Sequence, residues 1–196
     1  MTKPELRSLL AARVRLVPPD RRAAASAALC ATLRAQPAWA AARLVCAFLP
    51  LPSEPQIAEL WAGEAPRAFC FPRVRGQDVE LIRIDDPSLL RRATWKLEAA
   101  EFAAAPRVAA SEVDLFLVPG LGFTPGGLRL GRGGGYYDRL LARRRPESRA
   151  IGLCFAGQLV ADLPHEPHDQ RVDLVIAGDP VTATATVHDR SAPPPG

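Results

Sequence analysis

The sequence contains almost no lysine, and its positive charge therefore comes from arginine. Of 25 basic residues only Lys3 and Lys96 are lysines, against 21 acidic residues, which gives a formal net charge of +4. An arginine skew of this kind is typical of GC-rich coding rather than of a selected basic tail. Composition therefore gives no support to a nucleic-acid role, although a modest positive charge favours anionic partners such as phosphates and nucleotides.

Cysteine pairs and long apolar runs are also missing. The four cysteines form no Cys-x-x-Cys pair, and we expect reduced, structural thiols at Cys30, Cys46, Cys70 and Cys154. No stretch of about 18 apolar residues could span a bilayer, and the N-terminus opens with charged residues rather than a secretory signal. A cytoplasmic protein without a membrane partner is expected. The segment 13–43 has the composition of an organellar transit peptide, but Pro18 and Pro19 interrupt it.

The length of 196 residues and the hydrophobic content of 48% predict one globular domain. We place this domain at residues 1–187 and expect a disordered tail over 188–196, which ends in Pro-Pro-Pro-Gly. Between positions 3 and 17, Leu and Val recur at three- and four-residue steps, which predicts an amphipathic helix with Lys3 and Arg7 on one face. A second helix is expected over 21–35, capped by Asp20.

Six short apolar or alternating segments each predict a β-strand. They are Leu44–Leu49, Ala68–Phe71, Val79–Ile84, Asp114–Val118, Ala150–Phe155 and Leu174–Ala177. Helix-like segments at 54–62 and 138–145 lie between some of them. This alternation predicts an α/β fold with a mostly parallel sheet and helices on its faces. Polar and apolar residues partly alternate over 79–84, which indicates an edge or antiparallel strand.

Glycine is concentrated in one segment. Eight of the 14 glycines lie within Gly120–Gly135, after an apolar strand that ends at Val118 and before a helix that begins near Tyr136. The segment therefore joins the carboxyl end of a strand to the amino end of a helix, where open α/β sheets bind their ligands. Backbone amides of glycine can approach a phosphate closely, and we expect Arg129 and Arg132 to act as mobile cations beside them.

The segment matches neither of the standard nucleotide-binding glycine motifs, because it lacks both the Gly-Lys-Ser/Thr ending and a G-x-G-x-x-G next to the strand. A nucleotide site of another kind is predicted. The alternative is a hairpin tip in which glycines only satisfy turn geometry.

The only two tyrosines, Tyr136 and Tyr137, follow the glycines, and Asp138 comes next. Adjacent residues on a helix point to different sides, so one ring can pack in the core while the other stacks on a flat ligand. Asp138 is either a first-turn helix acid or, beside phosphates, a Mg²⁺ ligand. Further on, His165, Glu166, His168 and Asp169 suggest a transition-metal site, although Asp169 as a second Mg²⁺ ligand is the simpler hypothesis.

These residues together resemble a known family. Asp114-Leu-Phe-Leu-Val-Pro-Gly-Leu-Gly-Phe123, followed by Gly127-Leu-Arg-Leu-Gly-Arg-Gly-Gly-Gly-Tyr-Tyr-Asp-Arg139, closely resembles the signature of the 5-formyltetrahydrofolate cyclo-ligases. Lys3-x-x-x-Arg7, Phe48–Glu54, Trp95 and the segment from Ile151 to Asp173 are similar to the family's other blocks in the same order. The resemblance implies a three-layer α/β/α fold similar to that of ribose-phosphate isomerases and CoA transferases.

The resemblance also implies an activity, namely Mg²⁺- and ATP-dependent conversion of 5-formyltetrahydrofolate to 5,10-methenyltetrahydrofolate with release of ADP and phosphate. For ATP it implies contacts from Lys3, Arg7, Arg129, Leu130, Gly131, Arg132, Gly133, Gly134, Gly135, Tyr136 and Tyr137. The folate contacts would be Leu49, Glu54 and Tyr136, the Mg²⁺ ligands Asp138 and Asp169, and the catalytic residues Arg132 and Tyr136. A monomer that binds folate, with or without a polyglutamate chain, is expected.

Two other functions stay open at this point. A sugar-phosphate isomerase or CoA transferase on the same kind of fold would need an acid/base carboxylate and no ATP. A nucleotide- or RNA-binding module would use its arginines electrostatically, but Arg143-Arg144-Arg145 has no aromatic residues beside it and is interpreted as a solvated helix end.

Overall fold

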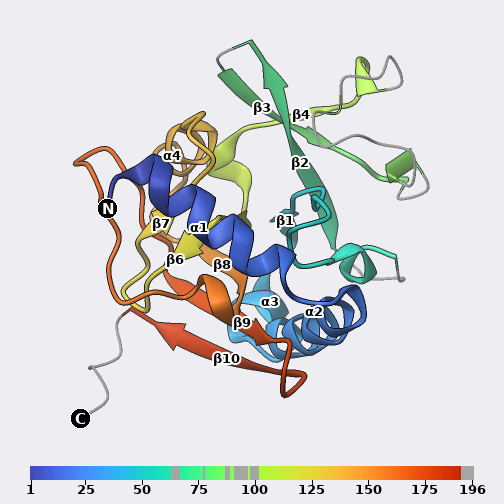
Figure 1. Cartoon of the computed structure of the whole chain (residues 1–196). Coiled ribbons are helices and arrows are strands. Elements are labelled where there is room, and N and C mark those ends of the chain that lie inside the picture. The colour runs from blue at the N-terminus through green and yellow to red at the C-terminus, as the bar shows by residue number, and fades with distance from the viewer. Residues whose placement is uncertain (63–66, 77, 87–88, 91–96, 98–101, 191–196) are drawn as a thin grey trace.

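The centre of the molecule is an eight-stranded sheet with the order β10-β9-β8-β5-β1-β2-β3-β4 (Figure 1). This computed structural model describes residues 1–62, 67–76, 78–86, 89–90, 97 and 102–190. The strands of the sheet are β1 (Leu44–Cys46), β2 (Ala68–Arg75), β3 (Asp78–Arg83), β4 (Arg107–Val108), β5 (Leu115–Pro119), β8 (Arg149–Phe155), β9 (Leu174–Asp179) and β10 (Thr184–Asp189). The five strands β2, β1, β5, β8 and β9 are parallel.

Antiparallel strands complete both edges of this parallel centre. β3 pairs with β2 and β4 pairs with β3 on one side, and β10 pairs with β9 on the other. The α/β prediction with a mostly parallel sheet is therefore confirmed, and so is the antiparallel interpretation of residues 79–84. Two antiparallel strands that follow each other in the chain can be joined by a tight turn. Gly76, whose backbone is left-handed (φ +60°), lies in the turn between β2 and β3.

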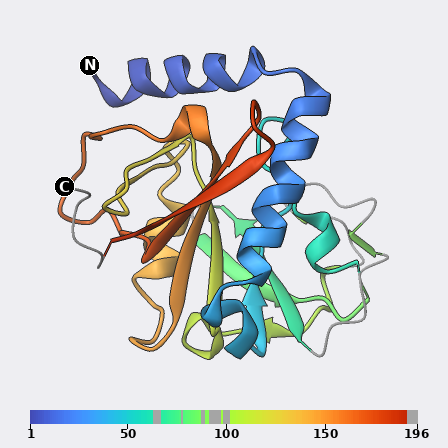
Figure 2. The same ribbon diagram turned by 90° about the horizontal axis from the view of Figure 1, so that it is seen from below.

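Helices cover the two faces of the sheet, which gives three layers. The helices are α1 (Lys3–Arg15), α2 (Pro19–Arg34), α3 (Pro37–Ala41) and α4 (Tyr136–Leu141). Along β5 the side chains alternate, so Leu115 and Leu117 join the core under α2 and α3, whereas Phe116 and Val118 join the core under α4. Figure 2 shows α2 lying along the sheet beside β9 and β10, where it packs.

Two local predictions were wrong. The second helix begins at Pro19 with Pro18 in the cap position and no side-chain cap, so Asp20 is a first-turn residue and not the cap. Proline tolerates the first helical position because its missing N–H would be unpaired there anyway. The expected helix over 54–62 is only a 3₁₀ turn, η1 (Ala58–Leu60). The Glu54 carbonyl oxygen accepts from the Gln56 side chain instead of from a helical amide, and the Gln56 amide donates to the Ser26 hydroxyl.

Other expectations concern the cysteines, the chain end and membranes. All four cysteines are buried and free, as predicted. β10 extends to Asp189 and so includes the first two residues of the expected tail, while residues 191–196 lie outside the described residues, as does Trp95. Among the described residues, no helix is long and apolar enough to cross a membrane.

The arginine run after α4 is tied to carboxylates rather than simply solvated. Arg143 pairs with Asp78, Arg144 with Asp173 and Arg145 with Asp114. Asp173 is the most buried of these acids, with a side chain 9% exposed. Its oxygens accept hydrogen bonds from Arg144 at 2.6 and 3.2 Å and from the Ala150 amide at 2.8 Å, and Arg190 lies 3.0 Å away.

This network predicts a contribution to acid stability. Burial alone raises the pKa of Asp173, but the Arg144 hydrogen bonds, the Ala150 amide and the charges of Arg144 and Arg190 outweigh it, so the pKa lies below its ordinary value. The stabilisation is therefore complete above the unfolded-state pKa of about 3.9 and is lost as the pH falls through the lower folded-state value.

We expect Asp173→Asn to reduce the free energy of unfolding by about 3 kcal/mol at pH 7, because it removes one partner of a buried ion pair. The difference from the unsubstituted protein should shrink below pH 4. Urea unfolding across the pH range measures both effects. Asp85→Asn, at an exposed ion pair with Arg83, is the matched control and should change little. A constant difference down to pH 2 would show that the charge of Asp173 is not what stabilises the fold.

Candidate active site

The glycine segment forms a short hairpin and then a tight loop that leads into α4. β6 (Gly122–Phe123) pairs with β7 (Arg129–Leu130). A hairpin was expected here only as the alternative to a nucleotide site. In the loop after β7, Gly133 (φ +105°) and Gly135 (φ +64°) adopt backbone conformations that favour glycine. The strand-to-helix placement of the segment is confirmed, but α4 has only six residues. Support for an anion site therefore comes from the loop amides and the arginines, not from the helix dipole.

A pocket of about 290 Å³ opens beside this loop. It brings together every residue that the resemblance to the cyclo-ligases assigns to ATP, folate, Mg²⁺ or catalysis, from four separate parts of the chain. They are Lys3, Arg7, Leu49, Glu54, Arg129, Leu130, Gly131, Arg132, Gly133, Gly134, Gly135, Tyr136, Tyr137, Asp138 and Asp169. Its size is at the lower end of the range for small-molecule sites.

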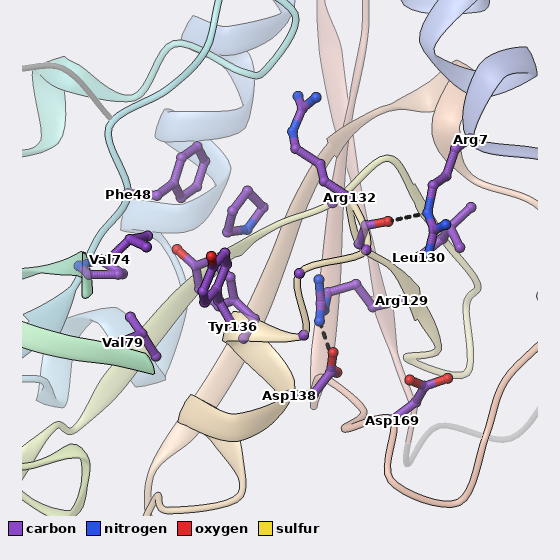
Figure 3. A pocket seen from close by; sticks show the side chains of 18 of the residues that line it. Arg7, Phe48, Val74, Val79, Arg129, Leu130, Arg132, Tyr136, Asp138 and Asp169 are labelled. Carbon is purple, nitrogen blue, oxygen red and sulfur yellow. Dashed lines mark hydrogen bonds and ion pairs between the residues drawn. The ribbon is translucent and has the colours of Figure 1, made fainter. Parts of the chain in front are cut away.

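The pocket has an apolar side and a charged side (Figure 3). On one side are the labelled side chains Phe48, Val74, Val79 and Tyr136, and opposite them are Arg7, Arg129, Asp138 and Asp169. Leu130 is apolar but lies beside Arg7 on the charged side. Arg132 lies between the two groups in this view. Such a division suits a ligand pair in which one partner carries a flat ring and the other carries phosphates.

Helix α1 closes the charged side, and Figure 1 shows it crossing the β6–β7 hairpin. Its apolar stripe docks it there, in a cluster of Leu6, Leu10, Leu128, Leu130 and Leu163. The capping box of Thr2 and Glu5 fixes the first turn. Lys3 and Arg7, which the spacing placed on one helix face, both line the pocket.

Lys3 and Arg7 of α1 already have partners among the residues that line the pocket. Arg7 donates from Nε to the Gly131 carbonyl oxygen at 2.8 Å. Lys3 donates to Glu166 at 2.8 Å and to Asp169 at 2.9 Å, and the Glu166 hydrogen bond is the main reason that the pKa of Lys3 lies above its ordinary value. Burial raises the pKa of Asp169, but Lys3 and the Glu166 amide outweigh it, so its carboxylate remains charged.

Arg129 is fixed rather than mobile, which corrects the sequence-based prediction. Its side chain is 4% exposed and donates to Oδ1 of Asp138 at 2.9 Å. Its guanidinium carbon lies 5.6 Å from the centre of the Tyr137 ring, and loss of water around that ring raises the pKa of the Tyr137 phenol. Asp138 also accepts from the Gln170 amide at 3.2 Å. Contacts from Asp138 and Tyr137, which follow the glycine loop in the chain, hold the arginine in place.

Arg132 connects the glycine loop to the other side of the pocket. Its guanidinium donates to Oε1 of Glu54 at 3.0 and 3.3 Å, and its own side chain is 48% exposed. Glu54 is buried, and its Oε2 accepts the Leu51 amide at 3.0 Å, which fixes the proline-rich loop around it. Of the two loop arginines, Arg132 is thus the one with freedom to move toward a ligand.

Comparisons with known proteins show to which family the chain belongs. A model of the 5-formyltetrahydrofolate cyclo-ligase family matches residues 1–178. The chain belongs to this family. The 5-formyltetrahydrofolate cyclo-ligase of Mus musculus is 32% identical over 57% of this chain and 61% of its own length, and that of Mycolicibacterium smegmatis is 31% identical over 68% and 73%. The match to this chain therefore spans about three fifths of the length of the mouse relative.

Two solved structures are also similar to this chain. The NMR structure of Aquifex aeolicus 5,10-methenyltetrahydrofolate synthetase matches with a TM-score of 0.80 and 25% identity over 100% of this chain and 96% of that one. A 5,10-methenyltetrahydrofolate synthetase from Mycoplasma pneumoniae matches with a TM-score of 0.69, and at 20% identity this shows the fold alone.

For this cyclo-ligase family member, the residues that sequence reasoning missed are mainly those of the apolar side. Pro72 and Val74 come from β2 and Val79 comes from β3. Val74 and Val79 are paired in the antiparallel register, so they present one continuous surface. Only the pairing of the two strands creates it, and no motif marks it in the sequence.

The hypothesis of a transition-metal site at His165–Asp169 gains no support, because within the described part of the chain no group of three or more His, Cys, Asp or Glu side chains is arranged so that it could hold a metal ion. The pocket does contain hard oxygen donors. Oδ1 of Asp138 accepts from Arg129 and the Gln170 amide, and Oδ2 of Asp169 accepts from Lys3 and the Glu166 amide. Carboxylate oxygens together with a triphosphate are a donor set that Mg²⁺ accepts, so the residues present fit this ion.

Proposed function

We propose that this protein catalyses the ATP-dependent conversion of 5-formyltetrahydrofolate to 5,10-methenyltetrahydrofolate. The observation that carries the proposal is the single pocket that collects all fifteen candidate residues and separates an apolar side from a charged one. Membership of the cyclo-ligase family gives the reaction class. The pocket supplies groups suited to both substrates of that class.

The charged side suits the triphosphate. The amides of Gly133, Gly134 and Gly135 can approach phosphate oxygens without interference from a Cβ, and Lys3 and Arg7 would neutralise their charge. Asp138 and Asp169 would hold Mg²⁺, which neutralises charge on the phosphate oxygens when it is bound. Arg129 would serve this side indirectly, because it fixes the Asp138 carboxylate.

The apolar side suits the folate. A flat ring can stack on Tyr136 and lie against Leu49 and Val79, while the buried Glu54 carboxylate can accept N–H groups from the ring edge. The Glu54 carboxylate already accepts a hydrogen bond from Arg132. A folate N–H group that took the place of this arginine would release Arg132 toward the reacting groups.

The reaction itself needs little covalent work from the protein. The oxygen of the N5-formyl group attacks the γ-phosphorus of ATP. A new O–P bond forms while the bond between the γ-phosphorus and ADP breaks. The N10 nitrogen then attacks the formyl carbon and loses its proton to solvent, and the C–O bond to phosphate breaks to leave the methenyl bridge. Positioning and charge neutralisation by Arg132, the loop amides and Tyr136 supply the acceleration.

Replacing Glu54 by Gln tests the division of the pocket. We expect the KM for 5-formyltetrahydrofolate to rise about tenfold, because a charge-assisted hydrogen bond becomes a neutral one. The KM for ATP should stay within about twofold, because Glu54 lies on the other side of the pocket. Steady-state kinetics with each substrate varied in turn measures both constants.

Glu59→Gln is the matched control, since Glu59 lies nearby in the chain but pairs with Arg34 on the surface and does not line the pocket. A rise in the KM for ATP with unchanged KM for folate would reverse the assignment of the two sides.

A further inference from the structure

Arg139 lies in α4 behind the glycine loop and is not among the residues that line the pocket. Its backbone amide donates to the Gly135 carbonyl oxygen at 3.1 Å, which forms the first helical hydrogen bond of α4. The side chain turns back toward the loop and contacts two residues that do line the pocket, Gly134 and Tyr136. Arg139 therefore reaches the site only through other residues.

The first contact holds the turn that precedes α4. Nη2 of Arg139 donates to the Gly134 carbonyl oxygen at 3.0 Å. A Cβ built on Gly135 would lie 2.8 Å from Nη1 of Arg139, so the guanidinium fills the space over the left-handed residue. A carbonyl tied in this way fixes the orientation of its peptide plane, and with it the direction of the next amide N–H in the loop.

The second contact holds the Tyr136 ring. The guanidinium carbon of Arg139 lies 5.2 Å from the ring centre, which is within the range of cation–π attraction. At its other end, the Tyr136 hydroxyl donates to the Gly76 carbonyl oxygen at 3.4 Å in the β2–β3 turn. The ring is thus held at its face and at its hydroxyl. Tyr137 has a comparable partner in Arg129, so each tyrosine of the pair is matched with its own arginine.

We propose that Arg139 is a positioning residue of the active site. It keeps the Tyr136 ring oriented toward the apolar side of the pocket and keeps the Gly134–Gly135 turn in the conformation that presents the loop amides. The kinetic part of this proposal rests on the proposed function, because the folate would stack on Tyr136. The structural part does not, because it concerns the ring and the turn in the protein alone.

The kinetic test compares Arg139→Ala and Arg139→Lys with the unsubstituted enzyme. We expect Arg139→Ala to lower kcat/KM for 5-formyltetrahydrofolate about tenfold, since misplacement of a positioning group costs rate without removing a reacting one. Arg139→Lys keeps a cation that can reach the ring but not the planar fork, and should recover part of the loss. The matched control is Arg143→Ala, which removes an arginine four positions on that pairs with Asp78 and does not line the pocket.

A spectroscopic test uses the fact that the chain has only two tyrosines. In protein labelled with 3-fluorotyrosine, the ¹⁹F spectrum should contain one resonance from each, and Tyr136→Phe assigns them. Arg139→Ala should shift or broaden the Tyr136 resonance and leave the Tyr137 resonance in place, because Arg129 still lies over that ring. Arg143→Ala should move neither resonance.

The outcomes distinguish a failure of the positioning role of Arg139 from a failure of the proposed function. A change confined to the Tyr136 resonance supports the positioning role even if the unsubstituted protein turns over no folate. An unchanged Tyr136 resonance, or equal changes at both tyrosines together with a lower melting temperature, overturns it. With an active enzyme, kcat/KM within twofold of the unsubstituted value for Arg139→Ala also overturns it.

Discussion

Asp138→Asn should lower kcat by roughly two to three orders of magnitude while the protein stays folded. The carboxylate lines the charged side of the pocket and is held by Arg129 and the Gln170 amide. The substitution keeps the shape of the side chain but removes the negative charge that would hold Mg²⁺ near the phosphates. The Mg²⁺ concentration required for half-maximal rate should therefore rise. Initial rates at several Mg²⁺ concentrations measure both effects.

The matched control for this substitution is Asp20→Asn. Asp20 also lies in the first turn of a helix, but it is exposed and lies outside the pocket lining. It should leave kcat and the Mg²⁺ dependence unchanged. If Asp138→Asn loses rate with no change in Mg²⁺ dependence, Asp138 acts through Arg129 alone and the metal assignment is wrong.

Gly127→Ala should cause the largest loss of stability among single glycine substitutions in the loop region. Gly127 has φ +80°, and a Cβ at this position would run into the backbone carbonyl oxygen of Val172. The backbone cannot move away, because the Val172 amide donates to the Gly127 carbonyl oxygen at 3.0 Å. We expect a loss of about 2–4 kcal/mol, or roughly 5–15 °C in melting temperature.

Thermal unfolding followed by circular dichroism measures this loss. Gly157→Ala is the control, since a Cβ at Gly157 would meet nothing within 4 Å and its φ is not left-handed. A melting temperature of Gly127→Ala within about 2 °C of the control would mean that the segment around Val172 adjusts easily and does not anchor the loop.

The amino-acid sequence was enough to predict those parts of the site whose residues are neighbours in the chain. Glycines before Tyr136-Tyr137-Asp138, placed between a strand and a helix, mark the loop without any knowledge of the fold. The four-residue spacing of Lys3 and Arg7 likewise places both on one face of a helix. That this face meets the glycine loop followed only from the resemblance to the family, because it depends on how α1 docks.

The parts that depend on which side chains meet in the folded chain could not be predicted. Arg129 was expected to be mobile, yet Asp138 and Tyr137 bury and fix it. The apolar side of the pocket exists only because β2 and β3 pair with Val74 opposite Val79. Neither strand carries a motif for this, since register is set by the turn and by burial rather than by any short pattern.

The measurement that tests the central claim most directly is the near-ultraviolet absorbance of the purified protein mixed with 5-formyltetrahydrofolate, ATP and Mg²⁺. Methenyltetrahydrofolate absorbs where the substrate does not, so its formation is followed continuously, with parallel reactions that each omit one component. The account predicts growth of this band in the complete mixture only, and its near loss with Asp138→Asn. A flat trace from folded protein in the complete mixture would contradict the proposed activity.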